Sequence, residues 1–240
     1  RENKVTKIKT DTGEIKLSSK IVKAYLVAGG GNVSDQEVKL FIALCSAQKL
    51  NPFIKEAHLI KYGSSPATMV VSKDVYQKRA DKHPEYQGKK AGIIVLTAEG
   101  KIDYRVGTFY IPSREELVGG WCEVYRKDRE PERVEVSLDE YVGKKKDGTV
   151  NAQWSGKPAT MIRKVAVAQC LREAFTSEFQ GMYVPEEIGV EDTTNNFVVE
   201  ETPQVHQAIE ATTAPTMQDI INEEKQAEPV PVDDFDPMSM

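Results

Sequence analysis

Strand–turn–strand patterns, separated by helical patterns, constrain the fold of this 240-residue chain more than any other feature of its sequence. Apolar and polar residues alternate over residues 57–62 and 67–71, on either side of a Gly-Ser-Ser-Pro turn. Two further hairpins are predicted, one around Glu99-Gly100 and one around residues 128–131. Because strands joined by short turns pair antiparallel, we predict an α+β fold in which an antiparallel sheet of hairpins packs with helices.

Two helices have clear start signals. Ser34 and Glu37 have the spacing of a capping box, and Asn51-Pro52 ends the helix that they begin. Pro158 suits the first turn of a long helix, which we predict over residues 159–175. Two shorter helices are also predicted, one after Ser18 or Ser19 and one over residues 74–82.

The charge of the chain divides near Pro185. Residues 185–240 contain 14 Asp and Glu but only one Lys, a charge of −13, so residues 1–184 carry +8 of the net −5. Apolar residues also thin out after Pro185, which is typical of a disordered acidic tail. We therefore predict a flexible basic segment at residues 1–17, a core domain at 18–184 and the tail at 185–240. The basic core is suited to attract a polyanion.

Cysteine use and hydropathy favour a cytoplasmic protein without membrane contact. Cys45, Cys122 and Cys170 are far apart and odd in number, so we predict reduced, buried thiols. No run of 18 apolar residues is present, which argues against a transmembrane helix. The basic N-terminal residues lack the apolar segment of a secretory signal.

The predicted long helix carries three cations on a mostly apolar surface. At roughly 100° per residue, Lys164 falls inside the apolar arc and Arg172 near its edge, whereas Arg163 projects from a strip of small residues. An unpaired buried charge is costly, so these cations need partners or must extend to water along their aliphatic stems. The sharper interpretation is that they hold phosphates, with the small residues allowing close approach. The apolar arc consists of Met161, Val165, Ala168, Leu171 and Phe175, and the small strip of Ala166, Cys170 and Ala174.

Other cations lie beside aromatic residues. A basic groove with stacking platforms is typical of proteins that bind single-stranded nucleic acid. Aromatic residues of strands more often belong to the core, so Tyr125 and Trp154 have two interpretations, base stacking or core packing. The neighbouring cations are Arg126, Lys127 and Arg129 after Tyr125, Lys144, Lys145 and Lys146 after Tyr141, and Lys157 after Trp154.

Three segments carry a family resemblance. They are Leu50-Asn51-Pro52-Phe53-Ile54-Lys55-Glu56, then Tyr125-Arg126-Lys127-Asp128-Arg129, then a stretch from Trp154 through Pro158, Met161 and Gln169-Cys170 to Phe175. Their order and spacing over residues 18–184 resemble the RecT/Redβ family of phage single-strand annealing proteins, and its Redβ branch in particular. The predicted tail is not covered by this resemblance.

The resemblance implies a function without covalent chemistry, and hence without catalytic residues. The protein would bind single-stranded DNA and anneal it to a complementary strand, giving duplex DNA, during phage homologous recombination in the bacterial cytoplasm. It would need no ATP, and Mg²⁺ would serve only as a counterion for DNA. The family also implies rings or helical filaments of protomers, and as partners a phage exonuclease and the host single-strand-binding protein.

The resemblance also implies which cations contact DNA. Those that match its motifs are Lys55, Arg126, Lys127, Arg129, Arg163 and Arg172. The run Lys144, Lys145 and Lys146 lies at a comparable place in the chain. The Redβ pattern has further cations where this chain has Ala159, Thr160 and Val165, and we expect Lys157 and Lys164 to compensate for them.

Two other functions stay open. A metal-dependent nuclease would need carboxylates that converge on Mg²⁺ and often a lysine, which Asp11, Glu14 and Lys16 faintly suggest. A basic adaptor or structural protein would instead bind an acidic partner. No nucleotide-binding loop is predicted, because no Gly-Lys-Ser/Thr follows the glycines at 29–31. The three histidines share no short spacing, so no metal site is predicted either.

Overall fold

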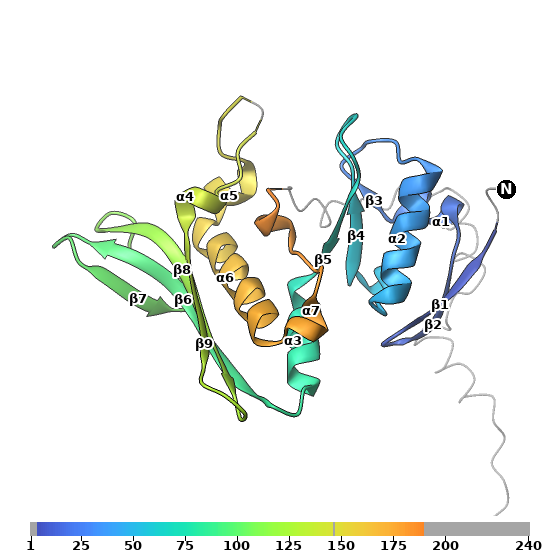
Figure 1. Cartoon of the computed structure of the whole chain (residues 1–240). Helices are drawn as coiled ribbons and strands as arrows, with labels where there is room; N and C mark the ends of the chain where they lie inside the picture. Colours follow the sequence, from blue (N-terminus) through green and yellow to red (C-terminus); the bar gives the residue numbers. More distant parts are fainter. Residues whose placement is uncertain (1–3, 146, 190–240) are drawn as a thin grey trace, which may run out of the picture. The chain divides into compact units, whose positions relative to one another are not determined.

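Hairpins and helices alternate along the chain, which confirms the predicted α+β class (Figure 1). The computed structural model describes residues 4–145 and 147–189, so Lys146 and all but the first five residues of the predicted tail lie outside the described residues. The strands are β1 (Thr6–Thr10), β2 (Gly13–Leu17), β3 (Val27–Ala28), β4 (Ala57–Ile60), β5 (Thr68–Val71), β6 (Tyr86–Thr97), β7 (Ile102–Val106), β8 (Glu115–Arg126) and β9 (Glu132–Ser137). The helices are α1 (Ser19–Tyr25), α2 (Asp35–Ala47), α3 (Lys73–Lys82), α4 (Leu138–Tyr141), α5 (Ala152–Gly156), α6 (Pro158–Ala174) and α7 (Thr176–Phe179), with 3-10 segments η1 (Pro52–Ile54) and η2 (Pro185–Glu187).

The N-terminal segment forms a hairpin, β1–β2, where we expect flexible chain. Ile8 pairs with Ile15 across the two strands, and Ile8 and Leu17 are buried in the hydrophobic core. A two-stranded hairpin is marginal by itself in water. Burial of its apolar face therefore stabilises this segment, which the polar composition of residues 1–17 does not reveal.

Helix α2 begins as predicted, with Ser34 as its N-cap. The Ser34 hydroxyl accepts a hydrogen bond from the Glu37 N–H (3.2 Å), and the Ser34 N–H donates to the Glu37 carboxylate (2.8 Å). Glu37 also accepts hydrogen bonds from Lys61 Nζ (2.7 Å) and from the Ala67 N–H (2.8 Å). The capping box thus holds the start of α2 against the β4–β5 hairpin.

A three-stranded sheet has the order β3-β4-β5. The β4–β5 hairpin is antiparallel as predicted, with His58 opposite Val70. Strand β3 adds to β4 in parallel, with Val27 opposite Leu59, which differs from an entirely antiparallel fold. The reason is the connection, because β3 reaches β4 through a crossover that contains α2, and such crossovers bring strands together in parallel.

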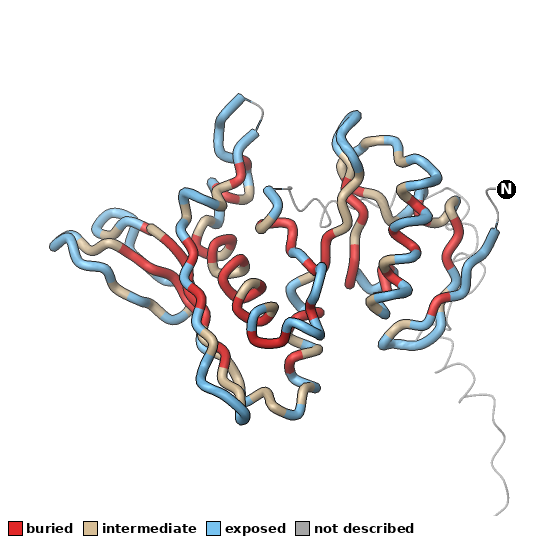
Figure 2. Tube along the Cα trace, viewed as in Figure 1, coloured by how far each residue is buried: buried red, intermediate tan, exposed pale blue. Residues whose placement is uncertain are grey.

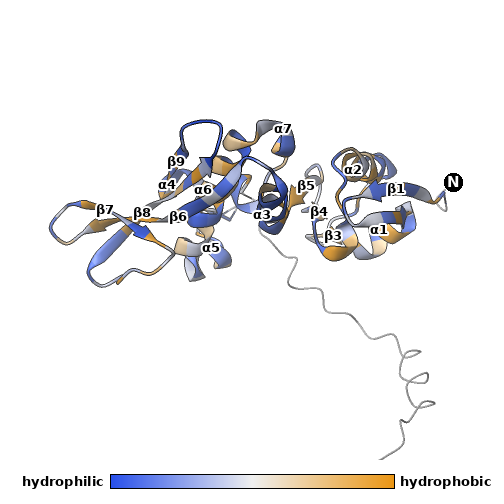
Figure 3. Ribbon diagram, turned by 90° about the horizontal axis from the view of Figure 1, so that it is seen from below, coloured by the Kyte–Doolittle hydropathy of each residue, from blue (hydrophilic) through white to orange (hydrophobic). Residues whose placement is uncertain are grey.

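A separate four-stranded sheet has the antiparallel order β7-β6-β8-β9, and α6 packs along it (Figure 1). Orange and blue bands along the strands in Figure 3 show the alternation of hydrophobic and hydrophilic residues. The buried face meets the helix, and most of α6 is buried (Figure 2). The predicted apolar arc of this helix is confirmed, since Met161, Val165, Ala168, Leu171 and Phe175 are all buried.

The folded core continues past the boundary that we predict at residue 184. Met182, Val184 and Pro185 are buried, and the Glu186 side chain is only 3% exposed. Segment η2 therefore belongs to the core although its composition is that of the acidic tail.

Two further predictions concern the cysteine thiols and membrane-spanning helices. Cys45, Cys122 and Cys170 are free thiols and are buried, as predicted. No helix within residues 4–145 and 147–189 combines the length and the apolar character needed to span a membrane.

Candidate nucleic-acid interface

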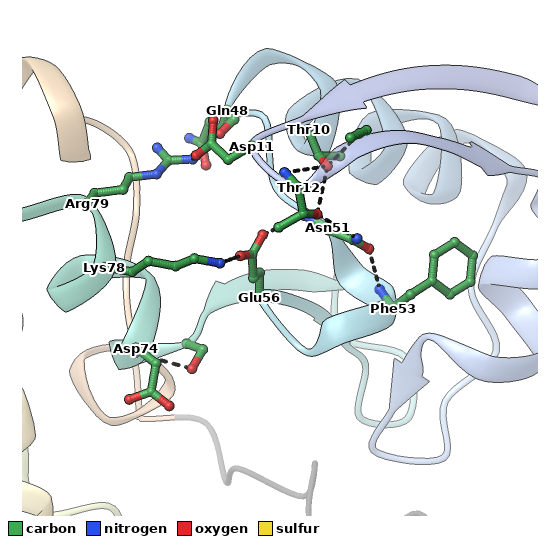
Figure 4. A network of polar contacts seen from close by, with 12 residues as sticks. Thr10, Asp11, Thr12, Gln48, Asn51, Phe53, Glu56, Asp74, Lys78 and Arg79 are labelled. Atoms are coloured by element: carbon green, nitrogen blue, oxygen red, sulfur yellow. Dashed lines mark hydrogen bonds and ion pairs between the residues drawn. The ribbon is translucent and has the colours of Figure 1, made fainter. Parts of the chain in front are cut away.

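The Asn-Pro turn between α2 and β4 is held by a buried hydrogen-bond network (Figure 4). The Asn51 side chain accepts from the Phe53 N–H (3.0 Å) and donates to Thr12 Oγ1 (2.9 Å). The Asn51 N–H donates to the Glu56 carboxylate (2.8 Å), and both residues are buried. Because buried polar groups without partners are costly, this network fixes the turn and its connection to the β1–β2 hairpin.

Lys55 leaves this turn with its side chain exposed. Its backbone is left-handed, with φ 62°. The next residue, Glu56, forms an ion pair with Lys78 Nζ at 3.0 Å, which joins the turn to helix α3 (Figure 4). The Asn-Pro segment thus positions one of the predicted DNA contacts beside a second basic element.

A groove of about 420 Å³ lies where the turn, α3 and the middle of α6 come together. Lys55 and Lys164, two predicted DNA contacts from different parts of the chain, both line it. Lys73 and Lys78 of α3 join them, so the groove has four lysines against three acidic residues, Glu56, Asp74 and Glu186. Lys164 also lines a neighbouring cavity of about 400 Å³ that contains Lys157. Lys55, Lys157 and Lys164, which are predicted to contact DNA, therefore line two cavities that share Lys164.

Lys73 and Lys78 are absent from the sequence-based prediction. No motif marks them, because α3 is a generally polar helix and its nearness to Lys55 and Lys164 depends on tertiary packing. The Lys73 and Lys78 side chains are about half exposed, at 53% and 46%, so both remain accessible to a ligand.

Lys164 is paired within the protein. Its Nζ lies 2.7 Å from Glu186 Oε1, and the Lys164 side chain is 21% exposed. An ammonium group has three N–H donors, so the pair with Glu186 leaves donor capacity for a ligand in the groove.

Arg172 makes more contacts within the protein than Lys164 does. Its guanidinium donates to both carboxylate oxygens of Glu187 (2.5 and 3.1 Å) and to the Met182 carbonyl (3.1 Å), and it stacks on the Tyr183 ring. Burial lowers the pKa of Arg172, but the hydrogen bonds and charge of Glu187 outweigh it and raise that pKa. The structure thus supplies a protein partner where we expect a phosphate.

Arg163 and the strip of small residues face the sheet. A Cβ added to Gly120 of β8 would lie 2.7 Å from the Ile162 carbonyl oxygen, and the Cys170 thiol donates to the Cys122 carbonyl (3.4 Å). Arg163 Nε donates to the Ala91 carbonyl of β6 (3.4 Å). The close approach that the small side chains allow is therefore made by the backbone of the sheet.

Two of the hairpin cations are bound to the end of α6. Arg126 and Arg129 both donate to the Ala174 carbonyl, Arg129 at 3.1 Å. Arg126 also pairs with Asp128 (2.7 Å) and lies over the Phe175 ring. Cations beside the last carbonyls of a helix interact favourably with its dipole. This placement gives the two arginines a structural role at the end of the helix.

The remaining predicted residues are spread over the surface and the core. Trp154 is 3% exposed, which favours core packing over base stacking, and Tyr125 is half-buried with its hydroxyl donating to Glu123 (3.0 Å). Lys127, Lys144, Lys145 and Lys157 are exposed, whereas Lys146 lies outside the described residues. Within residues 4–145 and 147–189, no group of three or more His, Cys, Asp or Glu is placed to hold a metal ion.

Comparison with known proteins places this chain in a family. No curated protein sequence matches it. A family model described as RecT family matches residues 12–200, which include the Asn-Pro turn, the three-stranded and four-stranded sheets, α6 and the groove. The match is to the family as a whole, so membership of the Redβ branch stays a prediction. Since the matched region is well over half of its 240 residues, the chain belongs to the RecT family, whose members anneal single-stranded DNA in recombination.

Proposed function

We propose that the groove lined by Lys55, Lys73, Lys78 and Lys164 binds the phosphates of a single DNA strand, and that the protein anneals this strand to its complement without ATP. The observation that carries the proposal is the meeting of Lys55 and Lys164 in one groove. These residues are 109 positions apart in the sequence, and each belongs to a segment that resembles the family.

Phosphate contacts position a strand without reading its sequence. The bases are then free to be tested by an incoming strand. Each correct stacked pair contributes on the order of 1.4 kcal/mol, so a short matched run outweighs mismatched encounters. In this mechanism no covalent bond changes, and Mg²⁺ acts only as a counterion.

We further propose that protomers assemble into a ring or helical filament, so that each holds part of a longer strand. Strand β7 lies at the edge of its sheet, and Ile102, Val106 and the following Phe109 are exposed there. An exposed apolar edge supports a protein–protein contact. A phage exonuclease that exposes the strand and the host single-strand-binding protein are proposed partners, by family resemblance.

The test is binding and annealing of labelled complementary oligonucleotides. Lys55→Glu and Lys73→Glu reverse exposed charges in the groove, and Lys39→Glu, on the exposed side of α2, is the matched control. We expect the groove variants to lose single-strand affinity by tenfold or more and annealing with it, in roughly additive steps. If the groove variants bind and anneal single-stranded DNA as the control does, the proposed groove is wrong. Binding that short oligonucleotides cannot compete for would instead favour the acidic-partner adaptor.

A further inference from the structure

Two lysines have a backbone conformation that normally favours glycine. Lys49 has φ 54° and Lys55 has φ 62°, and no other non-glycine residue in the described part of the chain has a positive φ. Each lysine ends a helical segment, since Lys49 follows the C-cap of α2 and Lys55 is the C-cap of η1. Glycine is the usual residue at such left-handed helix ends because it lacks a Cβ.

The hydrogen bonds around Lys49 explain its left-handed backbone conformation, but they do not explain why this residue is a lysine. The Leu50 N–H donates to the Cys45 carbonyl (2.9 Å) and the Lys49 N–H to the Ser46 carbonyl (3.3 Å), so the left-handed residue closes the end of α2. Glycine would close it with less strain. The Lys49 side chain is exposed and has no ion pair among the described residues, so it is available to a ligand.

Another cavity, of about 480 Å³, lies on the side of the turn that Lys49 faces. Lys49, Arg79, Lys82 and His83 line it, together with the acidic residues Asp11 and Glu178. It shares no lining residue with the groove that contains Lys55. The Asn-Pro turn is thus bracketed by two left-handed lysines, each of which lines a separate basic cavity.

Arg79 gives this cavity a fixed cation. Its guanidinium pairs with Asp11 (3.2 Å) and donates to the carbonyl oxygen of Gln48 (Figure 4). It also donates to the carbonyl oxygen of Glu178. Its Nε–H is buried, without an acceptor within the described residues, and is therefore not open to the cavity. Arg79 thus contributes a fixed positive charge, and not free donors, to the cavity that Lys49 and Lys82 also line.

We propose that the cavity lined by Lys49, Arg79 and Lys82 is a second phosphate-binding site, which holds nucleic-acid backbone on the far side of the Asn-Pro turn from the groove. This inference rests on the proposed single-strand binding and extends it. Two cavities separated by one rigid turn would hold two stretches of phosphate backbone in a fixed relation to each other.

Lys49→Gly tests the site without threatening the fold, because it removes the cation and relieves the left-handed strain together. We expect thermal stability to be retained or increased while affinity for single-stranded DNA falls on the order of threefold to tenfold. The slope of log affinity against log salt concentration should decrease in magnitude by about 0.7 for one lost phosphate contact with a single strand. Lys82→Ala should give the same loss, and Lys39→Ala should give none.

Lys55→Gly, measured beside it, separates the two sites. A loss of affinity in Lys55→Gly with unchanged affinity and salt slope in Lys49→Gly and Lys82→Ala would overturn the second site and leave the proposed function intact. No loss in any of the three variants would overturn both. If inorganic phosphate stabilises the wild type but not Lys49→Gly, while their DNA affinities agree, the assignment of the site to nucleic acid is wrong.

Discussion

The carboxylate of Glu187 receives two hydrogen bonds from the guanidinium of Arg172, at 2.5 and 3.1 Å, and ties the end of the described chain to helix α6. Only 3% of the Glu187 side chain and 19% of the Arg172 side chain are exposed. Losing one partner of such a pair leaves an uncompensated charge in a poorly solvated place. The segment after residue 184 therefore contributes to the stability of the core.

Glu187→Gln should destabilise the protein by about 3 kcal/mol, because it leaves Arg172 without its counter-charge. Urea unfolding measures the loss, with Glu173→Gln on the exposed side of the same helix as the control. If both variants unfold at the wild-type urea concentration, the pair has no structural role. The same experiment shows whether any loss of DNA binding in Arg172 variants reflects unfolding.

Gly120→Ala should destabilise by roughly 1–3 kcal/mol, because overpacking forces the helix away from the sheet. The added Cβ would lie 2.7 Å from the Ile162 carbonyl oxygen and 3.3 Å from the Arg163 nitrogen. Gly156→Ala is the matched control, since a Cβ there meets nothing within 4 Å. Thermal unfolding of both variants measures the difference in stability. Equal stability of Gly120→Ala and Gly156→Ala would contradict the close packing of α6 on β8.

Asn51→Ala should destabilise by about 1–3 kcal/mol, since it leaves the Phe53 N–H and Thr12 without their buried partner. Asn51→Asp keeps the acceptor for Phe53 but loses the donor to Thr12, and it adds a charge beside Glu56. We expect it to be destabilised as well. Denaturant unfolding of both variants and of the wild type at pH 7 gives the comparison. Equal stability of both variants and wild type would mean that the network does not fix the turn.

Glu37 predicts a dependence of stability on pH. Hydrogen bonds from Lys61, then from the Ser34 and Ala67 N–H groups, lower its pKa from 4.5 to about 2. A carboxyl whose pKa is lower in the folded protein stabilises the fold above its unfolded pKa, and that contribution is lost as pH falls through the folded one. The melting temperature of Glu37→Gln should therefore lie below that of wild type at pH 7, and the gap should narrow between pH 4.5 and 2.

Melting curves at several pH values test this, with Glu99→Gln in the exposed β6–β7 turn as the control. A gap between wild type and Glu37→Gln that stayed constant from pH 7 to pH 2 would show that the Glu37 charge does not contribute.

The sequence by itself determined the local elements and the family. Short-range patterns define them, such as the capping box of Ser34 and Glu37, the alternation along β4 and β5, and the apolar arc of α6 that begins after Pro158. Each of these depends on residues a few positions apart, so the sequence displays it directly. The Asn-Pro segment can also be identified from the sequence, but the hydrogen-bond network that joins Asn51 to Thr12 cannot.

Only the tertiary structure decided which charges meet. Lys164 pairs with Glu186, Arg172 with Glu187, and Arg126 with the end of α6, although all three cations were equal candidates for binding phosphate. The same packing placed Lys73 and Lys78 beside Lys55, and it made residues 6–17 a hairpin. The physical reason is that the environment of a long charged side chain depends on contacts between distant segments. The pattern of its neighbours in sequence does not encode those contacts.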